Sequence, residues 1–505
     1  MVFKPNFTKV VSSVRKNVGI TQSVIELKLP TNENVVTSVY SVGAKSSIIS
    51  SEASGKDVSF MGLVDFQAVY ESAGVSAVDY SAEFRDKISV DREVMGELIV
   101  TSNVVDVTSS VVAGGIRVVA IVEVTIDEIA STDLNVLTSA SGDGVHFSTS
   151  ELNVTSYVGK AYEKFDISGD LQIDGATGIL MVTPCVSLYD VKPKDNYLVV
   201  NGKLNVDICY KTGENVQDIN TKYHSIDFTW EVALEGLNPN STVQSVISLI
   251  SNEIRVSTVL EEGVATVNLY VPVVYTGYVF NDRVLEVVTD MYLENNYSSI
   301  TYENFGSLVG NCAVRFKDNI SGTASISDTS PFIDEILGVC TNNLVLASSR
   351  VVGDKLCIEG VANATVVYFT KETNDMTSVQ VEMPFAVEEK VTGEMASVVT
   401  ICLENIGARS KRGKEIEVSA ELSVYTDMYG ENSLCAITDV SIGEEKPQDD
   451  CSLYLYVVKP NQTIWDVAKD VNSSQELILE QNPDVELPLK GGEKLVVYKP
   501  HCMKF

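Results

Sequence analysis

The stretch LVVNGKLNVDICY, residues 198–210, decides the fold of this chain. Its apolar side chains recur at every second position from Leu198 to Tyr210, with Asn201 and other polar residues between them. A period of two predicts a strand with one face on a core and the other in water. Gly202 falls in register on the apolar face. Because a glycine weakens a strand unless a bulge, a bend or a close backbone contact requires it, its position predicts such a feature.

Two further stretches share this pattern, VSFMGLVDFQAVY at 58–70 and LCIEGVANATVVY at 356–368. Each of the three stretches places a glycine a fixed distance before a tyrosine. The pairs are Gly62 and Tyr70, Gly202 and Tyr210, and Gly360 and Tyr368. Since a pattern that returns along a chain indicates an internal repeat, we predict three copies of one unit, with a shared bend at the glycine.

Each of these strands is followed by a polar, turn-rich stretch and then by another alternating run that contains Phe84, Phe228 or Phe385. This order predicts a long hairpin in each copy. A second pair of strands is expected well after each glycine. Val, Ser, Thr and Tyr dominate these segments, which suits half-buried sheets, and few stretches show a helical period. The predicted fold class is therefore mainly β, with three tandem β-sandwich-like repeat domains and a small C-terminal domain.

The stretches between the copies are rich in Ser, Asn, Gly and Thr, and we expect connecting or decorating loops there, with room for an added hairpin. After the third copy, the charged run GEEKPQDD contains a proline and predicts a linker. The predicted units are an N-terminal segment at 1–21, repeats at 22–131, 163–282 and 318–431, connecting loops at 132–162 and 283–317, an acidic linker at 432–450 and a C-terminal domain at 451–505.

The C-terminal domain has the predicted order strand, helix, helix, strand, or βααβ. The elements are expected at 454–458, 464–470, 474–481 and 494–498. Thr463 with Asp466, and Ser473 with Glu476, have the spacing of an N-cap residue followed by an acidic residue at the third helical position. Such pairs satisfy the free amide groups of a first helical turn, so they mark the two helix starts.

The motifs YVVKP at 456–460, TIWDVA at 463–468, Asn482-Pro483 and GEKLVV at 492–497 resemble a LysM domain. The resemblance implies a groove for peptidoglycan or other N-acetylglucosamine-containing glycans. The groove residues would be Pro460, Asn461, Gln462, Thr463, Asn482, Pro483 and Leu489. This chain has Asn461-Gln462 where the family usually has Gly-Asp, which weakens the expectation of glycan binding.

Ile464 and Trp465 offer a second use of the same domain. Aromatic anchors tend to dominate the energy of protein interfaces, so we predict that these two residues bind a protein partner. The alternative is that Trp465 packs within the small domain, since tryptophan is often largely buried.

Three such units ahead of one LysM domain resemble the SipL-like family of clostridial spore coat morphogenetic proteins, whose repeats are called SPOCS domains. The resemblance implies a scaffold in the mother-cell cytoplasm, at the forespore surface and in the spore coat. It implies docking of the LysM domain onto SpoIVA, the ATPase that polymerises around the forespore. Other coat proteins and self-association remain open as further interactions. The alternative function is a peptidoglycan-binding protein of the cell wall or the spore cortex.

Composition and the absence of certain motifs argue against several classes of function. The chain has 69 acidic and 37 basic residues, a formal net charge of -32, so nucleic acid is not an expected partner. We expect neither a signal peptide nor a membrane-spanning helix. The nine cysteines are odd in number and form no Cys-x-x-Cys pair, which argues against a disulfide framework and a zinc site.

Catalysis is not expected either. The three histidines, His146, His224 and His501, fall in different predicted units, which leaves few options for general-base chemistry. The chain has no phosphate-binding loop and none of the common nucleophile or zinc-protease motifs. We therefore predict no enzymatic activity, no cofactor and no metal.

Overall fold

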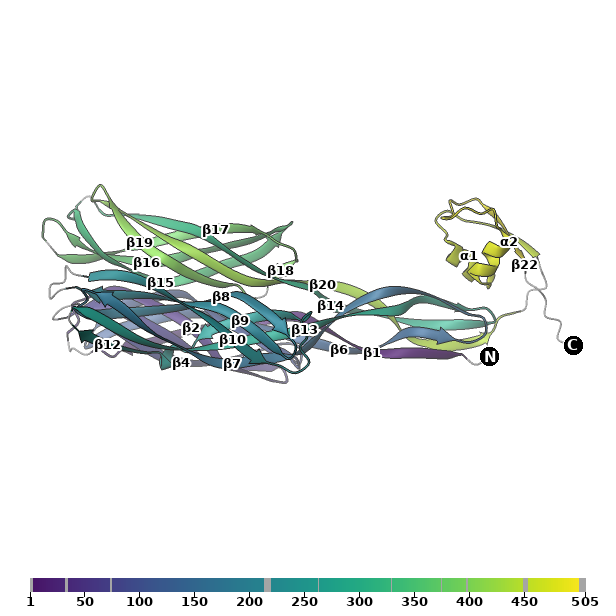
Figure 1. Ribbon diagram of the computed structural model, residues 1–505, viewed down its shortest axis with the longest axis horizontal. Helices are drawn as coiled ribbons and strands as arrows, with labels where there is room; N and C mark the ends of the chain where they lie inside the picture. The colour runs from purple at the N-terminus through teal and green to yellow at the C-terminus, as the bar shows by residue number, and fades with distance from the viewer. Residues whose placement is uncertain are drawn as a thin grey trace.

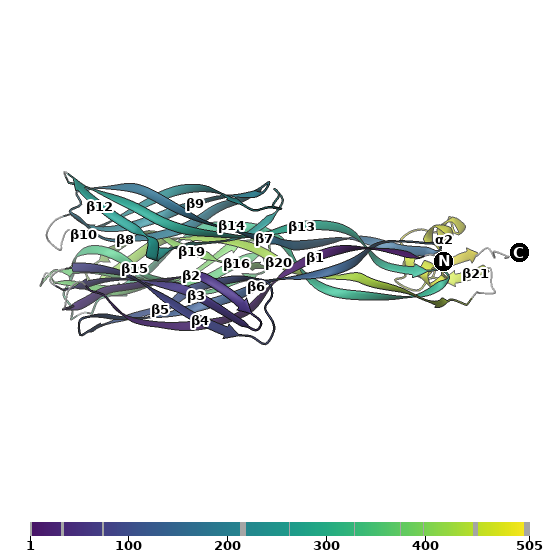
Figure 2. The ribbon, with the colours of Figure 1, turned by 90° about the horizontal axis from the view of Figure 1, so that it is seen from below.

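The computed structural model describes residues 3–31, 35–72, 75–212, 219–261, 263–327, 329–373, 375–396, 398–447 and 453–498. Three β-sandwiches, here called heads 1, 2 and 3, lie side by side at one end of an elongated molecule (Figures 1 and 2). Long strands leave the heads and run together as a narrow stalk. The N-terminus lies near the far end of the stalk, where the helical C-terminal module is also found.

Each head consists of two antiparallel sheets, one of which shares its long strands with the stalk. In head 1 the sheets are β2 (Ser38–Ser54), β3 (Asp57–Glu71) and β4 (Val75–Ser89), and β1 (Lys4–Leu29), β6 (Gly115–Ser141) and β5 (Glu97–Val112). In head 2 they are β8 (Gly178–Lys194), β9 (Tyr197–Lys211) and β10 (Ile219–Ala233), and β7 (Val145–Asp174), β13 (Val264–Leu293), β11 (Thr242–Leu249) and β12 (Arg255–Glu261), with the short helix η1 (Ser251–Glu253) between the last two. In head 3 they are β15 (Ile333–Val352), β16 (Lys355–Thr370) and β17 (Met376–Lys390), and β14 (Asn296–Ser325), β20 (Glu415–Glu445), β18 (Met395–Ala396) and β19 (Thr400–Lys411).

The glycine of the opening motif lies in the middle strand of each smaller sheet. Gly202 in β9 is paired with Phe228 in β10, and a Cβ at this position would meet the Phe228 ring and, at 2.6 Å, the carbonyl oxygen of Ser187. Gly62 with Phe84, and Gly360 with Phe385, show the same pairing and the same crowding. The strand on the other side has a register shift beside every one of these glycines. The repeated glycine therefore meets both a bulge and an overlying phenylalanine.

The three tyrosines of the motif end these same strands. Tyr70 and Tyr368 are buried, and Tyr210 is half-buried. They lie beside the apolar cores of heads 1, 3 and 2 respectively.

The stretches 132–162 and 283–317, expected as connecting loops, are strands. β6 and β7 are joined by a short turn, as are β13 and β14, so each stretch takes the chain from one ribbon to the next at the tip of the stalk. The expectation was wrong because a narrow ribbon buries few side chains: its strands can carry the Ser, Thr and Asn that sequence analysis associates with loops.

The stalk consists of three two-stranded ribbons, β1–β6, β7–β13 and β14–β20. A register shift in each ribbon, between Asn17 and Gly19, between Val279 and Phe280, and between Val309 and Asn311, marks the border between head and stalk. Such bulges bend a strand and increase its twist, so they redirect each ribbon from its sandwich into the common stalk. At the rise of an extended strand the stalk is roughly 45 Å long.

Apolar side chains and buried hydroxyl groups hold the three ribbons together. Val10, Val136, Val154, Val287 and Phe305 belong to one buried cluster to which all three ribbons contribute. Three hydrogen bonds cross between ribbons, from Ser12 Oγ to Gly306 O (2.7 Å), from Thr155 N to Ser307 Oγ (2.9 Å) and from Tyr157 N to Ser13 Oγ (2.8 Å). Because the three serines are buried, these bonds satisfy groups that water does not reach.

Polar side chains of the heads face neighbouring heads as well as water. Asn205, on the polar side of the opening motif, is buried; its Nδ2 lies 3.9 Å from Cys402 Sγ of head 3, and its Oδ1 accepts a hydrogen bond from the Tyr223 hydroxyl of its own head at 2.7 Å. Ser41 of head 1 donates to Asn342 of head 3 at 3.0 Å, and Thr183 of head 2 contacts Gln67 of head 1 at 3.3 Å. The prediction of a water-facing polar side is thus wrong where the heads meet.

One disulfide joins two heads. Cys185 in β8 and Cys402 in β19 are bonded, with their Cα atoms 6.5 Å apart. The odd number and the scatter of the cysteines argued against a disulfide framework, and this bond corrects that expectation. The partners are separated by 217 residues, so spacing in the sequence could not pair them.

We expect Gly202→Ala to lower the free energy of unfolding by about 2–3 kcal/mol, because the new Cβ overpacks the contact with Phe228 and the backbone of Ser187. Urea unfolding followed by circular dichroism measures this effect. Gly178→Ala in the neighbouring strand is the control, since a Cβ there meets nothing within 4 Å. Equal stability of the two variants would contradict the role assigned to Gly202.

Asp427 lies at the junction of heads 2 and 3 and is almost fully buried. Its carboxyl group accepts hydrogen bonds from the Ser245 amide at 2.7 Å and from the Tyr425 hydroxyl at 3.2 Å. Burial raises the pKa of Asp427 from 3.8 to about 7, although these hydrogen bonds and Arg15 oppose the shift. The folded chain therefore keeps this proton at pH values at which the unfolded chain has lost it.

This pKa predicts that stability falls as pH rises from about 4 to 7, because ionisation is easier in the unfolded chain. A pKa near 7 in place of 3.8 corresponds to roughly 4 kcal/mol above pH 7. Asp427→Asn should remove this part of the pH dependence and should stabilise the chain relative to wild type at pH 8. Urea unfolding at pH 5 and pH 8 measures it, with the exposed stalk residue Asp133→Asn as control. If the free energy of unfolding changed with pH in the same way in Asp427→Asn and in the wild type, this prediction would be contradicted.

Candidate partner-binding site in the C-terminal module

The C-terminal module consists of β21 (Leu453–Val457), α1 (Ile464–Val471), α2 (Gln475–Gln481) and β22 (Lys494–Tyr498), in the predicted order. The two strands form one antiparallel sheet. Buried Val467, Ala468 and Ile478 of the helices pack on buried Leu495 and Val497 of β22. The helices thus cover one face of the sheet.

Hydrogen bonds at the helix starts explain where the helices begin. Thr463 caps α1 and forms a reciprocal capping box with Asp466, as predicted. The cap of α2 is Ser474, one residue later than the predicted Ser473. Ser473 is buried, and its carbonyl oxygen accepts a hydrogen bond from the Tyr292 hydroxyl at 2.5 Å. This contact with a distant strand is not visible in the local sequence.

Trp465 lies against the tip of the stalk. Its indole Nε1 donates to Asp290 Oδ2 at 2.9 Å, and its ring meets the edge of the Tyr292 ring with centroids 5.0 Å apart. Lys469, one turn later on α1, donates to both Asp290 oxygens at 2.7 and 2.8 Å. Asp290 and Tyr292 belong to β13, so α1 is fixed to the stalk by side chains far away in the sequence.

Electrostatic interactions strengthen this contact between the C-terminal module and the stalk. Burial disfavours ionisation of Asp290, but hydrogen bonds from Lys469 and Trp465 outweigh burial and lower the pKa of this carboxyl group. The register shift in β13 skips Thr289 and lies directly before Asp290, which pairs with Ser148, so it changes the face of the ribbon on which the Asp290 side chain lies. Lys446 adds a second attachment, because its ammonium donates to Leu293 O at 2.7 Å and also to Asn472.

The two residues predicted to bind a partner are therefore half-buried within the molecule itself. Ile464 and Trp465 both pack against the core of the module, and Trp465 also contacts the stalk. A partner that used the Trp465 ring would meet a side chain already held by Asp290 and Tyr292.

The predicted glycan-groove residues are largely engaged in bonds within the module. Gln462 accepts from the Lys459 amide at 2.9 Å and donates to Asp470 at 3.0 Å. Asn482 donates to Ile478 O and Val496 O and accepts from Val496 N, all within 2.8 Å.

The remaining groove positions offer few polar side-chain atoms. Thr463 serves the capping box of α1. Pro460, Asn461 and Pro483 are exposed, and half-buried Leu489 packs on the core. The structure brings these residues to loops near the helices, yet few of their polar atoms remain for a ligand.

Sequence reasoning missed the other face of the sheet. Leu455 and Val496 are opposite each other, as are Leu453 and Tyr498, and Val457 lies beside them. These five side chains, here called the outer face, are between 41% and 62% exposed. A two-stranded sheet with both helices on one side must leave the other side open, and the apolar residues at alternate positions of 453–457 were the available signal.

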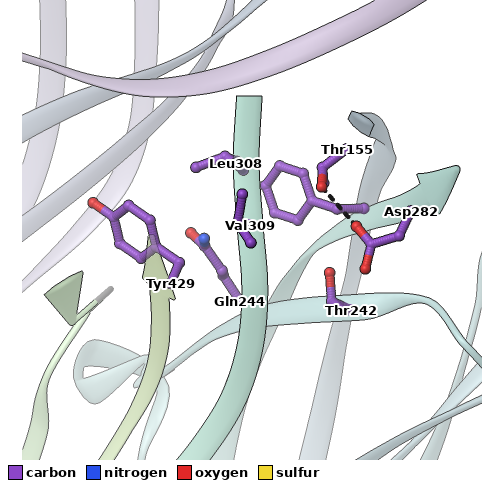
Figure 3. A pocket seen from close by; sticks show the side chains of 8 residues that line it. Thr155, Thr242, Gln244, Asp282, Leu308, Val309 and Tyr429 are labelled. Carbon is purple, nitrogen blue, oxygen red and sulfur yellow. Dashed lines mark hydrogen bonds between the residues drawn. The ribbon is translucent and has the colours of Figure 1, made fainter. Parts of the chain in front are cut away.

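A small cavity lies at the junction of heads and stalk (Figure 3). Its lining residues are Thr155, Thr242, Gln244, Phe280, Asp282, Leu308, Val309 and Tyr429. The Thr155 hydroxyl donates to Asp282 Oδ1 at 2.6 Å, the contact drawn in Figure 3. The interior has room for about one water molecule, far less than a small-molecule site needs.

The histidines take separate places. His146, in the stalk, lies 2.8 Å from Glu294 and stacks on Tyr292, whereas His224 belongs to β10 of head 2, where burial lowers its pKa. His501 lies outside the described residues. Within the described ranges, no three His, Cys, Asp or Glu side chains are grouped so that they could hold a metal ion. No helix in the same ranges has both the length and the apolar character needed to cross a membrane.

Comparison with known proteins gives one match. Residues 176–257, which include β8 to β11 of head 2, match the family described as SipL, SPOCS domain. Neither the curated proteins nor the solved structures gave a match to this chain. The family match supports a SipL-like spore coat protein.

Asp290→Ala should release the C-terminal module from the stalk, because it removes the acceptor of both Trp465 and Lys469. Hydrogen bonds to a charged group stabilise a contact by about 2 kcal/mol, so the module should spend far more time detached. In a Trp230→Phe background, Trp465 fluorescence should shift to longer wavelength and become more accessible to acrylamide. Glu286→Ala on the same strand is the control, since the Glu286 carboxylate accepts its hydrogen bond from Thr149 of the same ribbon, at 2.7 Å. Unchanged Trp465 fluorescence in Asp290→Ala would contradict the role assigned to Asp290 in holding the module against the stalk.

Proposed function

We propose that this chain, whose residues 176–257 match the SPOCS domain of the SipL family, is a spore coat morphogenetic scaffold that docks onto the forespore-coating ATPase SpoIVA. Docking is through the C-terminal module, proposed here to be a LysM domain used for protein recognition. The proposed location is the mother-cell cytoplasm at the forespore surface. We propose no catalytic role and no cofactor for it.

The outer face of the C-terminal sheet is the observation that carries this proposal. Full burial of one large apolar side chain stabilises a complex by about 1.5–3 kcal/mol, so five neighbouring ones provide a substantial docking surface. Exposed apolar patches of this kind mark interaction sites in soluble proteins. The C-terminal module lies at the end of the molecule away from the three heads (Figure 1), so the heads leave room for a large partner at this module.

The heads would supply the body of the scaffold. We propose that they are three copies of one unit, which agrees with their common arrangement of Gly202, Gly62 and Gly360 under a phenylalanine. Contacts between the heads are buried and hydrogen-bonded, as at Ser41 and Asn342. A rigid cluster of three units leaves several outer surfaces for further coat proteins.

Peptidoglycan binding is the second candidate, and the resemblance of the C-terminal module to LysM domains favours it. The bonds of Gln462 and Asn482 oppose it, because these side chains have few free polar atoms for a sugar. The exposed groove positions Pro460, Asn461 and Pro483 are where a glycan would still have to bind.

Leu455→Arg in the full chain should lower capture by purified SpoIVA at least about tenfold, because an arginine in the centre of the outer face cannot be buried without cost. Leu487→Arg is the matched control: Leu487 is also exposed and belongs to the same module, but it lies in the loop beside the proposed groove. A pull-down with equal input of each variant measures the effect.

The same two variants also test the alternative. If the chain pelleted with purified peptidoglycan, if Leu487→Arg but not Leu455→Arg prevented this, and if SpoIVA were not captured, the glycan function would replace the one proposed. Trp465→Glu places a second carboxylate beside Asp290, so it should also detach the module from the stalk. Comparison with Asp290→Ala distinguishes the loss of the contact between module and stalk from the loss of a partner contact at Trp465.

A further inference from the structure

β12 is an open edge of head 2. It pairs with β13 on one side, and in the described part of the chain no strand pairs with its other side. All seven of its residues, RVSTVLE, are exposed, among them the large apolar Val256, Val259 and Leu260. It lies on the outside of the molecule, at the end away from the stalk (Figures 1 and 2). An exposed, flat edge strand can accept another strand unless something blocks it.

The corresponding edges of the other heads are interrupted. β5 has a register shift between Val104 and Asp106, and β19 has one between Glu404 and Gly407. β19 also carries two cations near its end, which pair with Glu417. β12 has an unbroken register along β13, no proline and no lysine. It lacks these devices that prevent strand addition in natural sheets.

Backbone geometry tells which groups of β12 are available. Glu261 and Val264 are the closing pair of the β12–β13 hairpin, and such a closing pair exchanges hydrogen bonds within its own hairpin. Since the direction alternates along a strand, Val256, Thr258 and Leu260 point their amide and carbonyl groups away from β13. A new strand must therefore pair with the even-numbered residues.

We propose that β12 pairs antiparallel with β12 of a second copy of this chain, around a twofold axis at Thr258. In this register Thr258 faces Thr258, and Val256 faces Leu260 on both sides of the axis. Every even-numbered residue then meets an even-numbered residue, as the backbone requires. The same surface is used on both subunits, which is the rule for a twofold dimer.

Charge complementarity favours a second copy of this chain as the partner that pairs with β12. Arg255 and Glu261, at the two ends of β12, face each other in the proposed register, so the dimer has two ion pairs. Within the described residues neither side chain forms an ion pair, and Arg255 instead lies over the Tyr270 ring at 5.7 Å. Opposite charges directly across an antiparallel pair stabilise it, and like charges destabilise it.

Exchange of charges tests the register. Sedimentation of the full chain over a concentration series should show a monomer–dimer equilibrium at physiological salt. Arg255→Glu and Glu261→Arg should each weaken the dimer about tenfold or more, because each converts two attractions into two repulsions. The double variant should dimerise like wild type, and an equimolar mixture of the two single variants should form a mixed dimer.

A backbone variant tests the pairing itself. Thr258→Pro removes an amide that points away from β13, so head 2 should keep its fold while the dimer is lost. Ser109→Pro is the matched control at an outward-facing position of β5 and should leave the dimer intact. Circular dichroism shows whether each variant has folded.

These experiments use the purified chain alone, so they test the dimer independently of the proposed docking function. A wild-type monomer at all concentrations would overturn the proposal. A dimer that survives Thr258→Pro, or single charge variants that do not rescue each other, would show that another surface or register is used.

Discussion

Antiparallel pairing of long strands is the constraint on which the rest of this structure depends. Buried backbone amide and carbonyl groups must find partners, and here the first and last strands of each head find them in each other. Each head is therefore closed by a ribbon, and the chain must return to the tip of the stalk before it can begin the next head. This route gathers the three heads at one end and leaves the C-terminal module at the other (Figure 2).

The same pairing explains how an acidic chain packs three heads together. Alternation puts apolar residues on one face of each sheet and polar residues on the other, and the apolar faces are used up inside the sandwiches. Contacts between heads therefore use the outward faces, with an apolar cluster around Tyr40, Leu337 and Val367 and polar contacts such as the hydrogen bond from Ser41 to Asn342. The polar contacts need matched donors and acceptors, so they favour one relative position of the heads over others.

The sequence was sufficient for what depends on local pattern and insufficient for what depends on distant pairing. Alternation around Gly202 predicted a strand with a local irregularity, and Thr463 with Asp466 predicted a helix start, because both signals lie within a few residues. The stalk was mistaken for loops because the apolar side chains of its strands pack against partners on other ribbons, far away in the sequence. The disulfide and the buried Asn205 depend on segments that only the fold brings together.

The candidate site shows the same limit most clearly. A small module of two helices on two strands has two surfaces rich in apolar groups, and its sequence does not say which one is free. That choice is made by Asp290 and Tyr292, which lie on a strand of head 2 and receive the Trp465 side of the module. Once Trp465 is held against the stalk, the outer face around Leu455 is the apolar surface that points to solvent. The apolar surface that stays exposed is therefore decided by the stalk tip, through the hydrogen bonds of Asp290 to Trp465 and Lys469.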